Sequence, residues 1–266
     1  MTKRISRPVA LTIAGSDSGG GAGLQADLKT FAALGVHGTS VVTCITAQNP
    51  ARVRGIQACT SRMVREQLDA VFSELPPSAM KTGMLLSAPL IRAVFDFIRH
   101  HARVPLVVDP VMIATSGGRL LEGNARPALE KLMSLAALVT PNLDEATRLT
   151  GMRIRTEEGM RRAARRLHER YGCAALVKGG HLPRSREAVD ILFDGKEEFL
   201  LSAPFVTGVR THGTGCTYSA AITANLARGE KLIAAVTSAK KFITGAITHG
   251  YYVSNHFALD PLWNQR

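Results

Sequence analysis

Short, wholly apolar segments that each end in polar residues constrain the fold of this chain more than any other feature. The clearest three are 105–108, 136–139 and 174–177, which run into Asp109-Pro110, Thr140-Pro141-Asn142 and Lys178-Gly179-Gly180. Such segments are typical of parallel strands covered on both faces. In open sheets of this kind ligands bind beyond the carboxyl ends of the strands. The polar residues after each segment are therefore the first candidates for a functional site.

Segments with helical spacing alternate with these strands. Further strands are predicted at 8–14, 41–45 and 79–85, and helices at 24–32, 63–72, 90–98, 215–228 and 231–248. Residues 189–193 and 198–201, joined around Asp194-Gly195, predict a β-hairpin. This order predicts one α/β domain over residues 1–266, with a doubly wound, mostly parallel sheet and helices on both faces.

The composition excludes several classes of protein. A hydrophobic content of 45% is ample for a buried core. No apolar run reaches 18 residues, so no membrane span is expected, and the early apolar run at 9–14 is too short for a signal peptide. The four cysteines are scattered without a CxxC pair, which argues against zinc and disulfide sites and favours a cytoplasmic location.

A formal net charge of +12 raises the alternative of nucleic-acid binding. Much of the excess lies in one helical stretch with arginines at 161, 162, 165, 166 and 170, a spacing typical of a solvated helix face. Aromatic residues make up only 5% of the chain, and none alternates with these arginines to form a stacking platform for bases. No nucleic-acid partner is expected.

The segment from Thr211 to Thr217 (THGTGCT) is a glycine-spaced loop that leads into a small-residue helix. Glycines let the backbone turn its N–H groups inward, and a helix N-terminus adds a positive dipole end. The loop therefore predicts an anion site, in which Cys216 would occupy a position that favours a thiolate. The alternative is a turn that caps the helix, with Cys216 as a small buried hydrophobe.

The other candidates have structural alternatives as well. Asn142 and Glu145 are spaced as a capping box, and with Asp109 they could equally organise Mg²⁺ through carboxylate oxygens and water. Lys178 follows a buried strand and could neutralise phosphate charge. His181 and His212 are weaker candidates for a catalytic base than Cys216, because histidine beside glycine is often a turn residue.

Seven motifs in order across residues 8–248 resemble the hydroxymethylpyrimidine/phosphomethylpyrimidine kinases of thiamine biosynthesis, a branch of the ribokinase-like family. They are the stretches AGSDSGGGAGLQAD from Ala14, TAQN from Thr46, KTGM from Lys81, VDPVM from Val108, TPNLDE from Thr140, VKGGH from Val177 and THGTGC from Thr211. The resemblance implies a single ribokinase-like domain that uses ATP and Mg²⁺, usually as a homodimer. The implied substrate is 4-amino-5-hydroxymethyl-2-methylpyrimidine, phosphorylated first on its alcohol and then on the resulting monophosphate.

The resemblance also implies roles for individual residues. The pyrimidine pocket would be lined by Asp27, Gln48, Met84, Val111 and Cys216. ATP and metal would be bound by Asp109, Asn142, Glu145, Lys178 and the 211–215 loop. Within this set Thr211 would contact the nucleotide, and Glu145 and Asp109 would hold the metal. The transferring phosphoryl group would be contacted by Gly213, Thr214, Gly215, Cys216 and Lys178.

A pyridoxal/pyridoxine kinase of the same family is the alternative, and Gln48 is the residue that discriminates between the two. An aminopyrimidine edge needs the donor and acceptor of an amide, whereas a pyridine hydroxyl needs a different partner. The chain departs from the family near its C-terminus, where a Gly-His-Gly-Pro-like segment is replaced by the stretch from Thr248 to Phe257.

Overall fold

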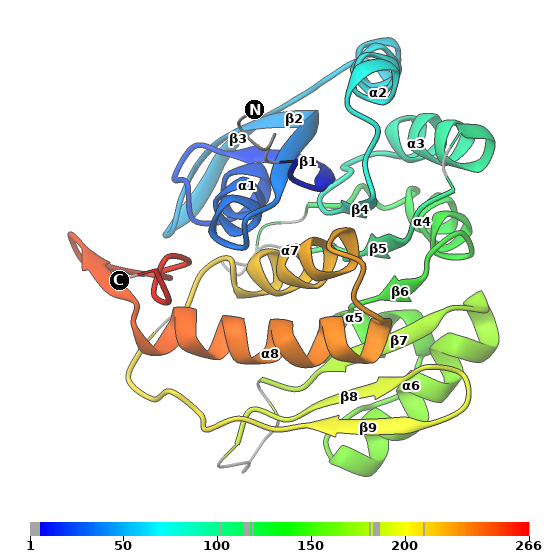
Figure 1. Cartoon of the computed structure of the whole chain (residues 1–266). Coiled ribbons are helices and arrows are strands. Elements are labelled where there is room, and N and C mark those ends of the chain that lie inside the picture. Colours follow the sequence, from blue (N-terminus) through cyan, green and yellow to red (C-terminus); the bar gives the residue numbers. More distant parts are fainter. Residues whose placement is uncertain are drawn as a thin grey trace.

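The computed structural model describes residues 6–101, 103–113, 118, 120–180, 182, 187–209 and 211–265. A nine-stranded sheet runs through its centre in the order β3-β2-β1-β4-β5-β6-β7-β8-β9 (Figure 1). The strands are β1 (Val9–Asp17), β2 (His37–Asn49), β3 (Arg52–Ala58), β4 (Ala79–Thr82), β5 (Leu106–Val108), β6 (Leu138–Val139), β7 (Ala174–Lys178), β8 (Asp190–Phe193) and β9 (Glu198–Leu201). The six strands from β2 to β7 in this order are parallel, whereas β3, β8 and β9 pair antiparallel at the edges. The prediction of a mostly parallel sheet is confirmed.

Helices cover both faces of this sheet. One core joins it to α2 (Ser61–Glu74), α3 (Ala88–His101), α4 (Arg126–Met133), α5 (Leu143–Thr150) and α6 (Glu157–Tyr171). The other core joins it to α1 (Gly23–Ala33), α7 (Thr214–Ala227) and α8 (Leu232–Thr248). Neighbouring strand residues such as Val107 and Val108 enter opposite cores, because side chains alternate across a strand. This is why the buried strands are apolar at every position.

The order of the strands places the site. From β1 the chain crosses to β2 on one side, and it later returns to β4 on the other side of β1. Ligands of doubly wound sheets bind at such a reversal, beyond the carboxyl ends of the strands. The N-terminus of α7 lies over these ends, since Lys81 on β4 reaches the Cys216 carbonyl oxygen.

Several predicted strand boundaries were wrong. The strand predicted at 8–14 extends to Asp17, and the one predicted at 136–139 covers only Leu138–Val139. The strand predicted at 41–45 extends over His37–Asn49, because its second half pairs with β3, which was not predicted. Residues such as Ile45 and Ala47 are exposed there, so the buried pattern that identifies a strand in the sequence is absent. The segment at 79–85 leaves the sheet after Thr82, where its parallel partners end.

The hairpin around Asp194 is confirmed as β8 and β9, and its turn is fastened by the Asp194 carboxylate, which accepts hydrogen bonds from the N–H groups of Lys196 and Glu197. At the C-terminus, β10 (Tyr251–Val253) and β11 (His256–Ala258) form a separate antiparallel pair in the segment that departs from the family pattern.

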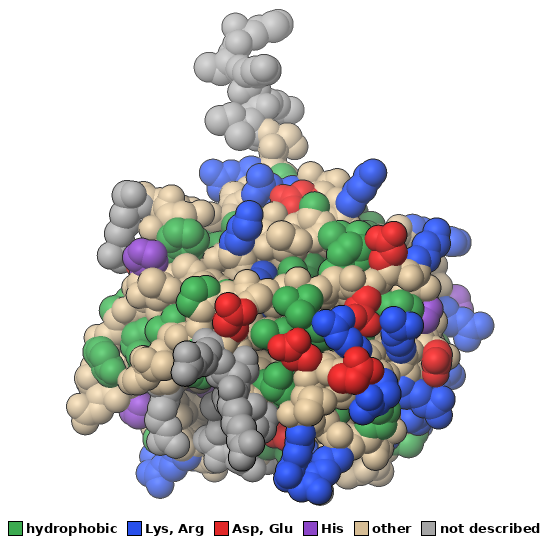
Figure 2. All heavy atoms as spheres, turned by 90° about the horizontal axis from the view of Figure 1, so that it is seen from below, with side chains coloured by type: hydrophobic (Ala, Val, Ile, Leu, Met, Phe, Trp, Pro, Cys, Tyr) green, Lys and Arg blue, Asp and Glu red, His purple; other side chains and the backbone are tan. Residues whose placement is uncertain are grey.

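The arginine-rich helix is α6, and its arginines have carboxylate partners. Arg161 and Arg165 contact Glu198, and Arg170 contacts Glu130. On the face drawn in Figure 2, Lys and Arg side chains lie in several groups with acidic side chains among them. This arrangement agrees with the prediction of a solvated helix face. No helix in the described ranges is long and apolar enough to cross a membrane.

Candidate active site

The loop before α7 packs directly against the glycine-rich turn that follows β1. Gly213 caps the helix with φ +79°, a left-handed conformation that favours glycine. A Cβ on Gly213 would lie 1.8 Å from the Gly21 carbonyl oxygen, so no side chain fits. The helix start has no side-chain cap, and the buried Thr214 hydroxyl has no partner among the described residues. Free donors at a helix N-terminus are what an anion site requires.

Asp109 and Lys178 face this loop from the ends of β5 and β7. Lys178 Nζ lies 2.9 Å from Asp109 Oδ1, and a Cβ on Gly215 would lie 3.2 Å from the same Nζ. Thr140 and Ser219 donate hydrogen bonds to the Asp109 carboxylate. Although burial opposes it, Lys178 holds the pKa of Asp109 below its ordinary value. The structure thus confirms that these strand ends bring a cation and a carboxylate to the glycine loop.

Lys81 is a second cation at the loop, and the sequence reasoning missed it. Its Nζ lies 2.7 Å from Asp27 Oδ1 and 3.5 Å from the Cys216 carbonyl oxygen. Both side chains of the pair are fully buried, and Thr12 donates a 2.6 Å hydrogen bond to the second Asp27 oxygen. Burial lowers the stability of the charged Lys81, but the Asp27 carboxylate raises its pKa above the ordinary value. The signal in the sequence was a lysine inside a short predicted strand, directly after Ala79 and Met80.

Asn142 and Glu145 form the capping box that their spacing allowed. The Asn142 side chain accepts from the Glu145 N–H, and Glu145 Oε2 accepts from the Asn142 N–H, each at 2.9 Å. Burial raises the pKa of Glu145 to about 7, with Lys178 opposing and Asp109 adding to the shift. The structural interpretation of this motif is confirmed, and a metal role would be additional to it.

The oxygen donors fit a magnesium ion held only partly by protein. No group of three His, Cys, Asp or Glu side chains suited to a metal occurs in the described part of the chain. Mg²⁺ is commonly held by one or two carboxylates, with water and substrate phosphates as its other ligands. Asp109 and Glu145 are two such buried carboxylates, and a cation beside them would offset the burial that raises the pKa of Glu145.

The residues predicted for a substrate pocket fall into three settings. Met84 and Val111 belong to a small apolar cluster with Cys44, separate from the two main cores. Gln48 lies at the exposed end of β2, with its amide 3.4 Å from His212 Nε2. Asp27 is fully enclosed by Lys81 and Thr12, so ligand contact would require a change in that arrangement.

The Cys216 thiol does not have the lowered pKa that its position at a helix N-terminus predicts. The thiol is partly buried at the first turn of α7. Burial raises its pKa to about 11, even though Lys81 opposes the shift. This raised pKa favours the thiol over the thiolate, so it contradicts the expectation that this position favours a thiolate. Thr211 is partly buried at the start of the loop, and His181 lies outside the described residues.

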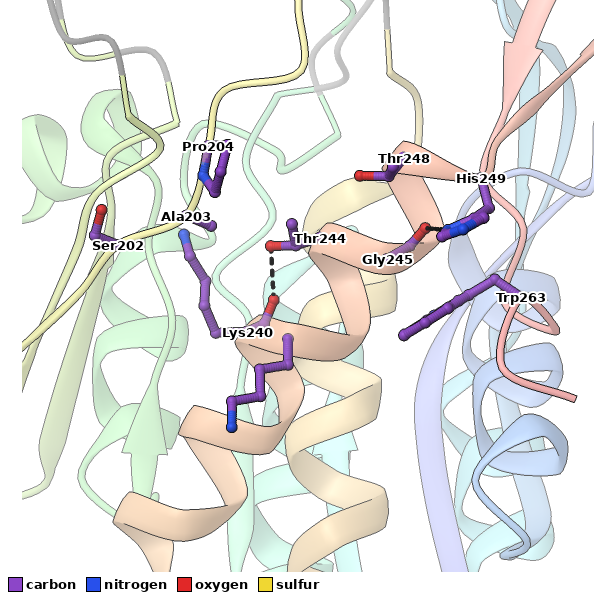
Figure 3. A pocket seen from close by; sticks show the side chains of 10 residues that line it. Ser202, Ala203, Pro204, Lys240, Thr244, Gly245, Thr248, His249 and Trp263 are labelled. Atoms are coloured by element: carbon purple, nitrogen blue, oxygen red, sulfur yellow. Dashed lines mark hydrogen bonds between the residues drawn. The ribbon is translucent and has the colours of Figure 1, made fainter.

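A separate pocket of about 310 Å³ lies between the end of β9 and the C-terminal half of α8, with Trp263 at its edge (Figure 3). Its wall includes Lys240, whose Nζ lies 2.6 Å from Asp190 Oδ2. Asp190 Oδ1 accepts the Gly179 N–H at 2.9 Å. The buried Lys240–Asp190 pair thereby links the pocket wall to Gly179, the residue that follows Lys178.

Comparisons with known proteins agree with this arrangement of the glycine loop, the two lysines and the reversal of strand order. The model of the family described as phosphomethylpyrimidine kinase matches residues 17–259. The chain belongs to this family.

Its curated relatives are named as pyrimidine kinases or as proteins of thiamine biosynthesis. A hydroxymethylpyrimidine/phosphomethylpyrimidine kinase of Streptomyces coelicolor is 45% identical over 94% of this chain and 92% of its own. The thiamine biosynthesis bifunctional protein ThiED of Geobacter sulfurreducens is 50% identical over 91% of this chain, which spans 49% of that longer protein.

Solved structures confirm the ribokinase-like fold. A phosphomethylpyrimidine kinase from Clostridium difficile has a TM-score of 0.81 at 41% identity and covers 91% of this chain and 100% of its own. An ADP complex of Bacillus subtilis pyridoxal kinase has a TM-score of 0.91 at 36% identity, covering 98% and 99%. The fold is therefore shared by both kinds of kinase.

Proposed function

We propose that this protein transfers a phosphoryl group from ATP to 4-amino-5-hydroxymethyl-2-methylpyrimidine, and then to the resulting monophosphate, in thiamine biosynthesis. The observation that carries the proposal is the uncapped α7 N-terminus, with Lys178 on one side and Lys81 on the other. The family and its curated relatives favour this substrate over pyridoxal.

The reaction assigns separate tasks to these groups. The substrate oxygen attacks the γ-phosphorus, the bond from that phosphorus to the β-γ bridging oxygen breaks, and ADP leaves. Negative charge on the transferring group is stabilised by the N–H groups of Gly215 and Cys216 and by the ammonium of Lys178, because catalysis of phosphoryl transfer is mainly positioning and charge stabilisation. Thr214 adds a hydroxyl donor that has no protein partner in the described structure.

Substrate and metal are assigned by the same logic. Gln48 would hydrogen-bond the aminopyrimidine edge, and Met84 and Val111 would pack against its flat ring. Magnesium would be held by Asp109 and Glu145, and it would supply positive charge that offsets the negative charge of the phosphates. A homodimer in the cytoplasm is the expected state of the enzyme.

The proposal is tested by ADP release from ATP with three acceptors side by side: the pyrimidine alcohol, its monophosphate and pyridoxal. We expect turnover with the first two at a kcat/KM well above that with pyridoxal. Turnover with pyridoxal alone would identify the alternative kinase. Salt-sensitive nucleic-acid binding without ATP turnover would overturn both kinase functions.

Cys216→Ala separates two roles of the thiol. The alcohol must lose a proton on attack, whereas the monophosphate is already an anion. If the thiol becomes the base once ligands are bound, the first phosphorylation falls more than the second. Equal losses in both steps assign Cys216 to the lining of the anion site, which is the role that its raised pKa favours.

Glu145→Gln separates metal binding from capping. The amide oxygen can still accept from the Asn142 N–H, so the helix cap is retained. We expect the Mg²⁺ concentration for half-maximal turnover to rise about tenfold or more, with the unfolding midpoint nearly unchanged. A large loss of stability with unchanged Mg²⁺ dependence would limit Glu145 to the capping box.

A further inference from the structure

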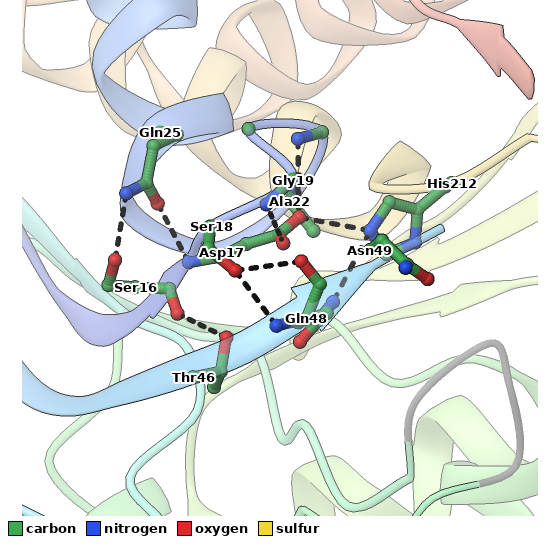
Figure 4. Close-up of polar contacts among 12 residues, drawn as sticks. Ser16, Asp17, Ser18, Gly19, Ala22, Gln25, Thr46, Gln48, Asn49 and His212 are labelled. Atoms are coloured by element: carbon green, nitrogen blue, oxygen red, sulfur yellow. Dashed lines mark hydrogen bonds and ion pairs between the residues drawn. The ribbon is translucent and has the colours of Figure 1, made fainter. Parts of the chain in front are cut away.

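His212 is wedged between the glycine-rich turn and the end of β2. A Cβ on Gly21 would lie 2.9 Å from His212 Cδ2, so the ring sits directly on the backbone of the turn. Its Nε2 lies 3.1 Å from Asp17 Oδ2, and the side chains of His212 and Asp17 are 15% and 3% exposed. Figure 4 shows His212 reaching Asp17 and Gln48 with the same edge of the ring.

Asp17 decides which atom of the histidine carries a proton. Its carboxylate accepts hydrogen bonds from the N–H groups of Gly19, Gly21 and Ala22 as well as facing the ring. Although burial opposes it, the hydrogen bonds from His212 and the backbone hold the pKa of Asp17 below its ordinary value. A carboxylate can only accept, so the imidazole must present Nε2–H to it, in its neutral or its charged form.

The proton on His212 in turn fixes the Gln48 amide. In Figure 4 the side-chain amide of Gln48 points its NH₂ group at the His212 ring. The nitrogen of that group lies 3.4 Å from the same Nε2. Two N–H donors facing each other form no hydrogen bond, whereas a half-turn of the amide brings its oxygen to that place. The N–H is then shared between Asp17, at an ordinary 3.1 Å, and Gln48, at the longer distance of 3.4 Å.

We propose that His212 is a positioning residue that holds the Gln48 side-chain oxygen and thereby turns the Gln48 NH₂ group away from the ring as a fixed donor for substrate. The ligand edge that this donor selects carries a hydrogen-bond acceptor, such as a ring nitrogen of an aminopyrimidine. The selection of that edge rests on the proposed function, whereas the Asp17–His212–Gln48 arrangement does not.

Kinetics test the link from His212 to Gln48. Loss of an oriented hydrogen bond costs about tenfold in affinity, and a contact made equally in ground and transition states appears in KM. We therefore expect His212→Ala to raise KM for the pyrimidine alcohol about tenfold, with a much smaller change in kcat. His212→Gln should restore KM to within about threefold, because its amide nitrogen can replace Nε2 as the donor.

A double-mutant cycle separates positioning from a general disturbance of the loop. If His212 acts through Gln48, His212→Ala should add no further increase in KM to Gln48→Ala. The proposal is overturned if the His212→Ala effect persists undiminished in that background, if it appears in kcat instead, or if His212→Gln behaves like His212→Ala.

The proton assignment has a readout that does not depend on activity. With ¹⁵N-labelled histidine, the imidazole signals that disappear in His212→Gln belong to His212. We expect them to show a protonated Nε2 in the full-length protein without ligand, and an unprotonated Nε2 overturns the proposal. If the wild type does not phosphorylate the pyrimidine alcohol, the proposed function fails while this spectrum still decides the arrangement.

Discussion

Two lysines approach the α7 N-terminus from strands β4 and β7, which are separated by β5 and β6, and they differ in what surrounds them. Lys81 is fully buried with Asp27 and reaches the backbone of Cys216. Lys178 is 13% exposed, and its Nζ would lie 3.2 Å from a Cβ on Gly215. Lys81 supports the backbone of the loop from the protein interior. Lys178 lies beside the loop with part of its side chain exposed, where a ligand bound to the loop would contact it.

Two Lys–Asp ion pairs therefore have different consequences at different depths. Removing one partner of an enclosed pair leaves an uncompensated buried charge, which is strongly destabilising. Removing a cation that faces a binding site removes charge stabilisation of the reaction instead. Stability should therefore report on Lys81, and turnover should report on Lys178.

Lys81→Met should have the largest effect. Methionine is of similar length, but Asp27 would lose its only ion-pair partner in the described structure while remaining fully buried. We expect the free energy of unfolding to fall by about 3–5 kcal/mol, measured by urea denaturation. Lys81→Met combined with Asp27→Leu should recover much of this loss, since apolar replacement of both partners is often tolerated. A single variant as stable as the wild type would contradict the comparison.

Lys178→Met should come next and act on a different quantity. Loss of one group that stabilises developing charge lowers kcat by about 10²–10³, or 2.7–4 kcal/mol. Asp109 keeps its hydrogen bonds from Thr140 and Ser219, so the unfolding free energy should fall much less than in Lys81→Met. Steady-state ADP release and urea denaturation on the same samples give both values. Unchanged turnover with a large loss of stability would make the two lysines equivalent.

The sequence predicted Lys178 and missed Lys81 for a physical reason. Lys178 follows a wholly apolar strand, and the carboxyl ends of parallel strands meet at one edge of the sheet. Lys81 lies inside a strand, and its partner Asp27 is on α1, 54 residues away in the chain. No local spacing reveals such a pair, because only the packing of α1 against the sheet brings Asp27 to Lys81.

The same distinction applies to the rest of the fold and site. The buried strands, the hairpin at Asp194 and the capping box at Asn142 follow from local patterns, and all three were predicted. The strand β3 was missed because its exposed residues have no core to face. The raised pKa of Cys216 was missed because burial, which opposes the helix dipole, is a property of the assembled site.

Gly215→Ala should have the smallest effect. It tests whether turnover depends on the position of the Lys178 ammonium group as well as on its charge. The new Cβ would lie 3.2 Å from Lys178 Nζ, a flexible tip that must shift by a few tenths of an ångström. Gly215 is in the first turn of α7, where alanine favours the helix by up to about 1 kcal/mol. We expect kcat to fall about tenfold or less while the unfolding free energy is unchanged or slightly higher, because a small misplacement of a charged group weakens its interaction with the reacting phosphate.

Gly159→Ala is the matched control for this variant. Gly159 lies in the first turn of α6, and a Cβ there would meet its nearest neighbour, Thr156 Oγ1, at 3.4 Å, an ordinary contact. This substitution gives the same helix benefit far from Lys178 in the sequence, so stability should change as in Gly215→Ala while kcat stays at the wild-type value. If both variants turn over normally, the site tolerates movement of the lysine, and its charge alone matters. If Gly215→Ala instead loses stability as Lys81→Met does, the loop is held as tightly on the ligand side as on the buried side, and the contrast between the two lysines disappears.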